Sequence, residues 1–219
     1  MMNPMRKKAL CAGFLFGACL AACRGTAPIA QDRPHAGMAA VIIAGQFQTP
    51  NGPAKKGDSF INLESREGDV YRLRVSSGKT ILYQIEPGFY HFAPTRSLFG
   101  TPEKTLRVAV NGRNYRIAFP KELINESAFE AKPSHVAILG LLAISISAPL
   151  PGRGPIVNVN LNDMVSDRRA IVQGLIGEMM APSAARSVRK SALSWLNSLQ
   201  TALIRLSAEP QSPLDASPN

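Results

Sequence analysis

Residues 70–92, VYRLRVSSGKTILYQIEPGFYHF, indicate the fold class of this chain. In Val70–Val75 apolar side chains alternate with Arg72 and Arg74, and the same alternation returns in Thr80–Ile85. A Pro-Gly pair then turns the chain into a short aromatic segment. Apolar side chains at every second position are typical of strands with one buried face. The stretch therefore predicts short strands joined by tight turns.

Similar segments lie on both sides of this stretch. They are Met38–Phe47, Phe60–Leu63, Leu106–Val110, Tyr115–Phe119, Val136–Ala148 and Ile156–Leu161. Asn111-Gly112 joins two of them and is a strong hairpin signal. Val136–Ala148, the most hydrophobic segment after the leader, is too short to span a bilayer as a helix and predicts a buried central strand, broken or bulged near Gly140. Strands at this spacing predict an antiparallel β-sandwich or barrel.

After Leu161 the pattern becomes helical. Asn162 or Asp163 is suited to cap a helix that runs to about Met180. A second helix is predicted over Ser183–Leu206. The expected fold class is mainly β with C-terminal helices (α+β), an antiparallel β-sandwich followed by two helices.

The second predicted helix is amphipathic. Trp195 belongs to its apolar stripe, and Arg186, Arg189 and Lys190 lie in its N-terminal half. Such a stripe most commonly packs on its own domain, and this is the favoured interpretation. The alternative is a surface that binds a partner or a membrane interface, with Trp195 as the anchor and the three cations meeting phosphates.

The first residues have the pattern of an export signal. A basic cluster at residues 6–8 precedes an apolar run, Ala9–Ala18, that is too short for a permanent membrane helix. The run leads into four residues, Leu20, Ala21, Ala22 and Cys23. These four residues resemble the lipobox of bacterial prolipoproteins. The resemblance implies cleavage before Cys23 and a covalent lipid on its thiol, and no other cofactor is expected.

Two other interpretations of the leader remain open. An ordinary secretory signal would be cut after Ala22 or Ala27, and a retained anchor is the third possibility. The cysteine positions favour the lipoprotein, because Cys11 and Cys19 leave with the leader and only Cys23 remains. A mature chain with one cysteine forms no internal disulfide, and a lipid-linked thiol is protected from oxidation.

The lipobox divides the chain and implies a location. The expected parts are a signal peptide (1–22), a lipidated tether (23–37), the sandwich (38–161), the helical pair (162–206) and a disordered tail (207–219). Arginine rather than aspartate at position 24 favours, by resemblance to sorting in Gram-negative enterobacteria, the outer membrane facing the periplasm.

The charge suggests classes of partner. The chain carries +10, and the leader contains three cations and no acid, so the mature chain carries +7. This favours attraction to an anionic envelope polymer or to lipid headgroups, with solvated surface as the plainer interpretation. An exported chain without a recognition motif is not expected to bind nucleic acid.

A second resemblance concerns the sandwich. Ile85–Phe92, with its Pro-Gly pair before an aromatic strand, resembles an element of transthyretin-like and carboxypeptidase-regulatory-like sandwiches. His135–Ile146 and Val157–Met180 resemble the following strands and helix of small envelope lipoproteins of unknown function. The resemblance implies a β-sandwich and no activity.

Residues with catalytic potential are sparse. The histidines His35, His91 and His135 lack metal-ligand spacing, and no metal is expected. No nucleophile elbow is present. Glu86 with His91 is the one pair that suggests a site, and a strand-surface histidine is the plainer interpretation. The acidic group of Glu64, Glu67 and Asp69 and the Gly152-Arg153-Gly154 segment are interpreted as turns.

These observations favour a lipid-anchored, non-enzymatic binding or assembly component of the cell envelope. One alternative is an envelope enzyme that acts on peptidoglycan or glycan with a site assembled from distant residues. The other is a structural accessory subunit of an envelope machine.

Overall fold

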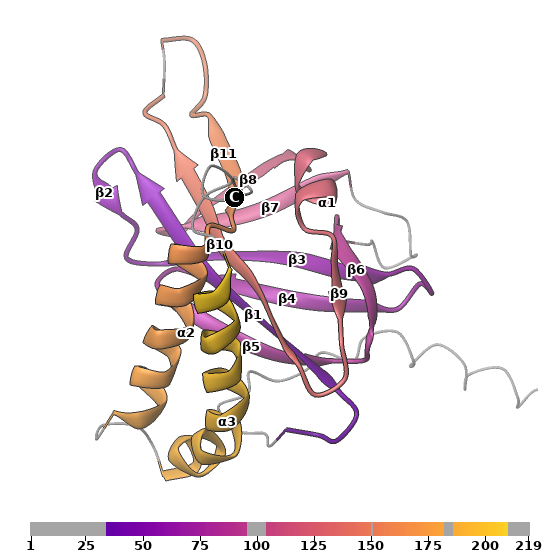
Figure 1. Cartoon of the computed structure of the whole chain (residues 1–219). Coiled ribbons are helices and arrows are strands. Elements are labelled where there is room, and N and C mark those ends of the chain that lie inside the picture. Colours follow the sequence, from indigo (N-terminus) through magenta and orange to yellow (C-terminus); the bar gives the residue numbers. More distant parts are fainter. Residues whose placement is uncertain (1–33, 96–103, 150, 182–185, 210–219) are drawn as a thin grey trace, which may run out of the picture.

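The computed structural model describes residues 34–95, 104–149, 151–181 and 186–209 (Figure 1). Within 186–192 it describes the helical backbone and not the side chains. The predicted signal peptide, the lipobox and most of the predicted tether lie outside the described residues, as do residues 210–219 of the predicted tail.

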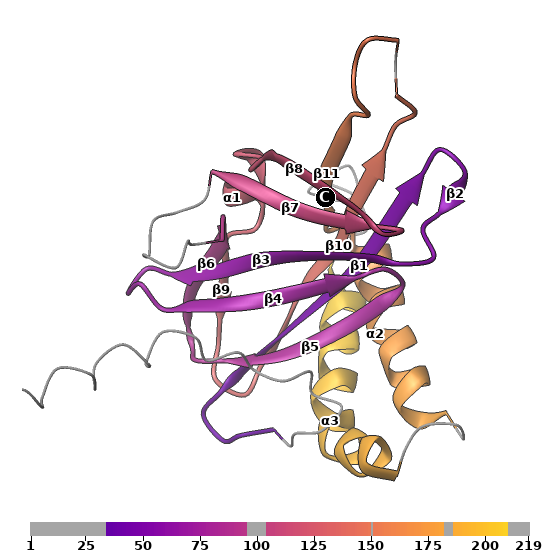
Figure 2. The ribbon, with the colours of Figure 1, turned by 180° about the vertical axis from the view of Figure 1, so that it is seen from behind.

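The fold has three layers, a helical pair and two sheets (Figures 1 and 2). The middle layer, here the helix-side sheet, contains β1 (Ala39–Thr49), β2 (Gly52–Pro53), β5 (Lys79–Ile85), β10 (Val136–Ile146) and β11 (Val157–Asn162). The outer sheet contains β3 (Gly57–Ser65), β4 (Val70–Ser76), β6 (Gly88–Ala93), β7 (Thr105–Val110), β8 (Arg113–Ala118) and β9 (Phe129–Ala131). The helices are α1 (Glu122–Glu126), α2 (Val165–Met180) and α3 (Arg186–Ala208). This confirms a mainly β fold followed by two helices.

The predicted alternation builds the core between the two sheets. In β4, Tyr71, Leu73 and Val75 are at most 5% exposed, whereas Arg72 and Arg74 point outward and are exposed. Apolar residues of both sheets form one continuous buried cluster. Burying a large apolar side chain contributes about 1.5–3 kcal/mol, so this cluster dominates the stability of the sandwich.

β1 differs from the other strands because it lies in the middle layer. Ala40 and Ile42 join the cluster beneath α2 and α3, whereas Val41 and Ile43 join the core between the sheets. All four residues are at most 2% exposed. Burial on both faces explains why this strand is an almost continuous apolar run without alternation.

One strand pair differs from the predicted antiparallel arrangement. β1 pairs antiparallel with β5 but parallel with β10. Parallel neighbours need a long crossover connection. The chain between β1 and β10 contains all six strands of the outer sheet. Local alternation and turn signals do not report a pairing at such a separation.

The predicted irregularity near Gly140 is confirmed as a register shift. Ile42 pairs with Ile138, whereas the next residue, Ile43, pairs with Gly140. Gly140 has φ 111°, and a Cβ at this position would lie 2.3 Å from the carbonyl oxygen of Asn162. Any other residue would be strained there and would collide with the backbone that leaves β11.

Asn111 and Gly112 form the predicted two-residue turn between β7 and β8. Their φ values are 49° and 83°, the positive pair that a type I′ turn requires. Val110 pairs with Arg113 directly across the turn, so the turn fixes the register of the whole hairpin.

The predicted N-cap of the first C-terminal helix is wrong by one to two residues. Asn162 pairs with Leu141 as the last residue of β11, and α2 begins at Val165 with Met164 at the N-cap. No side chain caps this helix end. Pairing with β10 holds Asn162 in an extended conformation, so Asn162 does not cap the helix although its side chain is suited to do so.

We expect Gly140→Ala to lower the free energy of unfolding by at least about 2 kcal/mol, because it adds strain at positive φ and a backbone clash. Gly154→Ala is the matched control, since a Cβ at Gly154 meets nothing within 4 Å. Urea denaturation measures both. Equal stability of the two variants would contradict the close approach of residues 140 and 162.

A candidate binding surface on the uncovered sheet face

The two outward faces of the sandwich differ in whether described helices cover them. α2 and α3 cover the helix-side sheet through contacts with β1, β5 and β10. Leu123 of α1 is buried in the core between the sheets, so that short helix closes an end of the sandwich. Among the described elements no helix covers the outward face of the outer sheet (Figure 2).

Four arginines from three strands share this uncovered face. Arg72 and Arg74 lie on β4, Arg107 on β7 and Arg116 on β8, and all four are exposed. Phe60 of β3 pairs with Arg74, and Arg107 pairs with Arg116. Their strand neighbours Leu73, Leu106 and Val108 point into the core. We call the surface formed by Phe60, Arg72, Arg74, Arg107 and Arg116 the arginine face.

Two arginines stack on aromatic rings, Arg72 of β4 and Arg66 of the turn that follows β3. The Cζ atom of Arg72 lies 4.3 Å from the centroid of the Phe60 ring, and that of Arg66 lies 4.5 Å from the centroid of the Phe89 ring. Stacking uses the flat face of a guanidinium and leaves its N–H donors in the plane. Neither guanidinium forms a hydrogen bond or ion pair with the described residues. Both can therefore donate to an anion.

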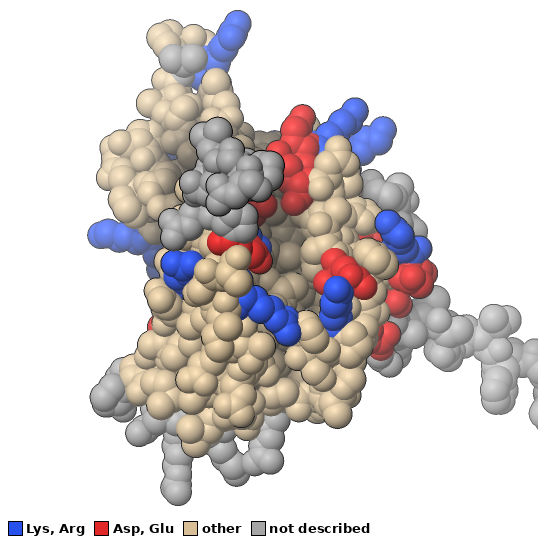
Figure 3. All heavy atoms as spheres, viewed as in Figure 1, with Lys and Arg blue, Asp and Glu red and all other residues tan. Residues whose placement is uncertain are grey.

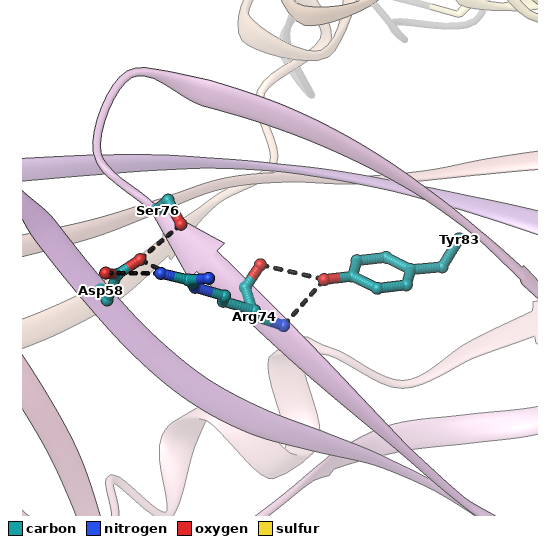
Figure 4. Close-up of polar contacts among 4 residues, drawn as sticks. All are labelled: Asp58, Arg74, Ser76 and Tyr83. Atoms are coloured by element: carbon teal, nitrogen blue, oxygen red, sulfur yellow. Dashed lines mark hydrogen bonds and ion pairs between the residues drawn. The ribbon is translucent and has the colours of Figure 1, made fainter. Parts of the chain in front are cut away.

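Arg74 is engaged with the protein itself (Figure 4). Its Nε and Nη2 donate to the two carboxylate oxygens of Asp58 at 3.1 and 2.9 Å. The Ser76 hydroxyl donates to the same carboxylate. The hydrogen bond from Arg74 is the main reason that the pKa of Asp58 lies below its ordinary value; partial burial opposes the shift, and Ser76 and the charges of Arg74 and Lys79 add to it.

Tyr83 of β5 fixes the backbone beneath this ion pair. Its hydroxyl accepts from the Arg74 N–H at 2.8 Å and donates to the Arg74 carbonyl at 3.0 Å (Figure 4). Burial raises the pKa of Tyr83, which keeps the hydroxyl a donor. Because β4 pairs only with β3 among the described strands, Tyr83 satisfies an edge position and ties the outer sheet to the helix-side sheet.

Trp195 is buried, so the alternative prediction that it anchors a docking surface is wrong. The side chain is 3% exposed and packs with α2 and the helix-side sheet, as the packing interpretation expects. Burying so large an apolar ring stabilises the fold, which favours packing of Trp195 inside the domain over exposure on its surface. Arg186, Arg189 and Lys190 lie in the first turns of α3, and their side chains are outside the described part.

The lipobox residues Leu20, Ala21, Ala22 and Cys23 lie outside the described residues. Within the described ranges, no helix is long and apolar enough to cross a membrane.

The strand register brings one histidine candidate and one acidic candidate side by side. His91 pairs across strands with Glu64. The Glu86 backbone instead accepts from the Tyr90 hydroxyl and donates to the Tyr71 hydroxyl. Across the residues that the structure describes, no group of three or more His, Cys, Asp or Glu side chains could hold a metal ion.

A shallow hollow of about 150 Å³ lies between α3 and the start of β10. It is lined by Ser134, His135, Val136, Asn197, Ser198, Thr201 and Arg205. The hollow is on the helical side of the molecule, and no residue of the arginine face lines it. Figure 3 shows that much of the surface over α2 and the described part of α3 carries no charge.

Comparison of the sequence with known protein families and with curated proteins finds no match.

Part of the arginine face follows from the local sequence pattern. Arg72 and Arg74 follow directly from the alternation in β4. The type I′ turn places Arg107 opposite Arg116, because four residues lie between each arginine and the turn centre. The adjacency of β4, β3 and β7 was not available from local patterns.

We expect Trp195→Ala to lower the free energy of unfolding by about 3–5 kcal/mol, because it removes a large side chain from a packed layer. Leu193→Ala, on the same helix and 67% exposed in the wild type, is expected to change stability by less than about 0.5 kcal/mol. Chemical denaturation compares them. An unchanged stability of the Trp195 variant would contradict the packing.

The stabilising effect of Asp58 should depend on pH. The pKa of Asp58 in the folded protein lies below its ordinary value of 3.8. The stabilisation by Asp58 is therefore complete above pH 3.8 and is lost as the pH falls through the pKa of the folded state. We expect Asp58→Asn to lower the free energy of unfolding by less than about 1 kcal/mol, because the ion pair is exposed. This difference from the wild type should be constant from about pH 7 to 5 and should shrink below about pH 4. A difference that stays constant to about pH 2 would contradict this.

Proposed function

We propose that this protein is a lipid-anchored lipoprotein of the cell envelope that acts as a non-enzymatic binding component. The lipobox-like residues 20–23 support the anchor, with a covalent lipid on Cys23 and attachment to the periplasmic side of the outer membrane. The binding element is the arginine face, and the partner is another component of the envelope.

The observation that carries the binding role is the contrast between the two sheets. Within the described part of the chain, α2 and α3 cover the helix-side sheet, whereas no helix covers the arginine face. Exposed arginines gathered on one face of a sheet are suited to recognising anions. Asp58, which shares this face with Glu64 of the same strand, is held ionised by Arg74 and is a weak base, which disfavours acid–base catalysis at the position of Asp58.

The start of the domain suits a short tether. The Ser134 N–H donates to the Met38 carbonyl at 2.8 Å, and the His35 N–H donates to the Gln84 side chain at 2.8 Å. These bonds hold the chain at the end of the sandwich where β1 and β10 begin. The preceding residues 23–33 reach at most about 40 Å when extended, which keeps the domain near the membrane.

A second candidate is a structural accessory subunit that assembles through its helical layer. The exposed apolar side chains Leu193 and Ile204 on α3 and Met180 on α2 favour it, at 67%, 71% and 48% exposure. A stoichiometric partner crosslinked through Ile204 would support this function over that of a ligand-binding module.

We expect cells fed a clickable palmitate analogue to label the wild-type protein and the Cys19→Ala variant, and not Cys23→Ala. Cys19 is the matched control because it leaves with the leader when cleavage precedes Cys23. Membrane fractionation should place the two labelled proteins in the outer membrane. An unlabelled wild type, or label that persists in Cys23→Ala, would overturn the lipid anchor.

A further inference from the structure

The outward side of α3 carries the two most exposed large apolar side chains of the described protein. Leu193 is 67% exposed and Ile204 is 71% exposed. They lie about 16 Å apart along the helix axis. Leu193 precedes Asn197 by one turn, and Ile204 follows Thr201 by three residues, so these side chains are neighbours on one side of the helix. We call the surface formed by Leu193, Asn197, Thr201, Ile204 and Arg205 the α3 surface.

The polar hollow between α3 and the start of β10 opens on the α3 surface. Asn197, Ser198 and Thr201 line it from the helix. Arg205 also lines it, and no carboxylate of the described chain does. The Arg205 guanidinium forms no hydrogen bond or ion pair with the described residues. Its donors can therefore bind an anion at the hollow, next to hydroxyl and amide groups that donate as well.

The sequence of α3 is basic. Between Arg186 and Ala208 no Asp or Glu occurs, and the cations are Arg186, Arg189, Lys190 and Arg205. The charge of this helix is therefore +4. α2 adds no net charge, because it contains two cations and two acids, Arg168, Arg169, Asp167 and Glu178. Glu209, which directly follows α3, forms an ion pair with Arg168 at 2.6 Å. Cations beside exposed apolar side chains suit an anionic lipid surface.

The chain enters the domain beside the same hollow. The Ser134 N–H donates to the Met38 carbonyl at 2.8 Å, and Ser134 lines the hollow. The proposed tether therefore joins the domain close to the α3 surface. A tether of about 40 Å keeps this surface at a high effective concentration near the membrane. A weak contact is then enough to orient the domain.

We propose that the α3 surface docks on the anionic headgroups of a phospholipid bilayer. Arg205, with Asn197 and Ser198, binds a headgroup phosphate at the hollow. Leu193 and Ile204 enter the membrane interface at the two ends of the surface. This inference rests on the proposed function for the lipid anchor that brings the domain to the membrane. The chemistry of the contact comes from the described side chains of α3.

Docking through α3 would set the direction of the arginine face. The helical pair and the outer sheet are the two outer layers of the fold, with the helix-side sheet between them (Figures 1 and 2). A domain that rests on the bilayer through α3 therefore turns the arginine face away from it. The proposed binding element then points toward other components of the envelope.

A protein partner fits the α3 surface less well. The centre of a protein interface is a continuous apolar patch, often with aromatic side chains. Leu193 and Ile204 are instead separated by the polar side chains that line the hollow. Trp195, the aromatic residue of α3, is buried against the helix-side sheet.

The test uses the mature chain, residues 23–219, with Cys23→Ala so that no covalent lipid contributes to binding. Vesicles of phosphatidylglycerol and phosphatidylcholine in equal parts are the anionic probe, and pure phosphatidylcholine vesicles are the neutral control. The double variant Ile204→Ser/Arg205→Gln removes one apolar side chain and one charge from the α3 surface. Ile156→Ser/Arg153→Gln makes the same changes between β10 and β11, where both side chains are exposed, and is the matched control.

We expect the parent chain and the matched control to co-sediment with anionic vesicles with affinities within about twofold of each other. The Ile204/Arg205 variant should bind about tenfold more weakly, because it loses one cation and one inserted side chain. Neutral vesicles should bind the parent chain more weakly than anionic ones. An environment-sensitive fluorophore on Ile204→Cys should shift to the blue with anionic vesicles, and the same label on Arg153→Cys should not. Thermal unfolding should show both double variants folded, because all four side chains are exposed.

Absence of binding to anionic vesicles would overturn the proposal, and so would equal weakening in the two double variants. Displacement from the vesicles by soluble glycerol 1-phosphate at the same phosphate concentration would assign the hollow to a free phosphomonoester instead. A dimer in solution that Ile204→Ser dissociates would assign the α3 surface to a second copy of the chain. Failure of the lipid anchor is a separate result, because the vesicle assay uses a chain without the lipid.

Discussion

The burial of β1 on both faces is the constraint on which the other parts of the structure depend. Val41 and Ile43 close the core between the sheets, while Ala40 and Ile42 form the floor beneath the helices. The strand also pairs with β5 on one edge and β10 on the other. No residue along Ala39–Ala44 can become polar without leaving a buried group unsatisfied in one of the two cores. The helical pair is therefore a required layer of the domain.

This arrangement decides which surfaces remain for binding. The helix-side sheet loses its outward face to α2 and α3, and Trp195 is used in that contact. The outward face of the outer sheet has no such requirement, so packing places little restriction on its residues. Four arginines gather there, and two of them, Arg107 and Arg116, are direct cross-strand neighbours.

Polar contacts at the edge of the outer sheet connect this surface to the core. Tyr83, rooted in β5, holds both backbone groups of Arg74, whose side chain in turn is held by Asp58. These contacts give the arginine face a rigid border. They also distinguish Arg74, which is engaged with Asp58, from Arg72, which stacks on Phe60. A rigid scaffold with a few free donors is suited to binding without conformational change.

Local features were determined by the sequence alone. The strands of residues 70–92, the type I′ turn at Asn111-Gly112, the irregularity at Gly140 and the two C-terminal helices follow from neighbouring residues, because alternation, turn geometry and helical periodicity act over a few positions. The start of α2 was misplaced because a strand ladder, a tertiary interaction, holds Asn162. Only the tertiary structure decided the parallel pairing of β1 with β10, the burial of Trp195 and the assembly of the arginine face. Each depends on segments separated by many residues, whose approach is governed by which apolar faces bury one another.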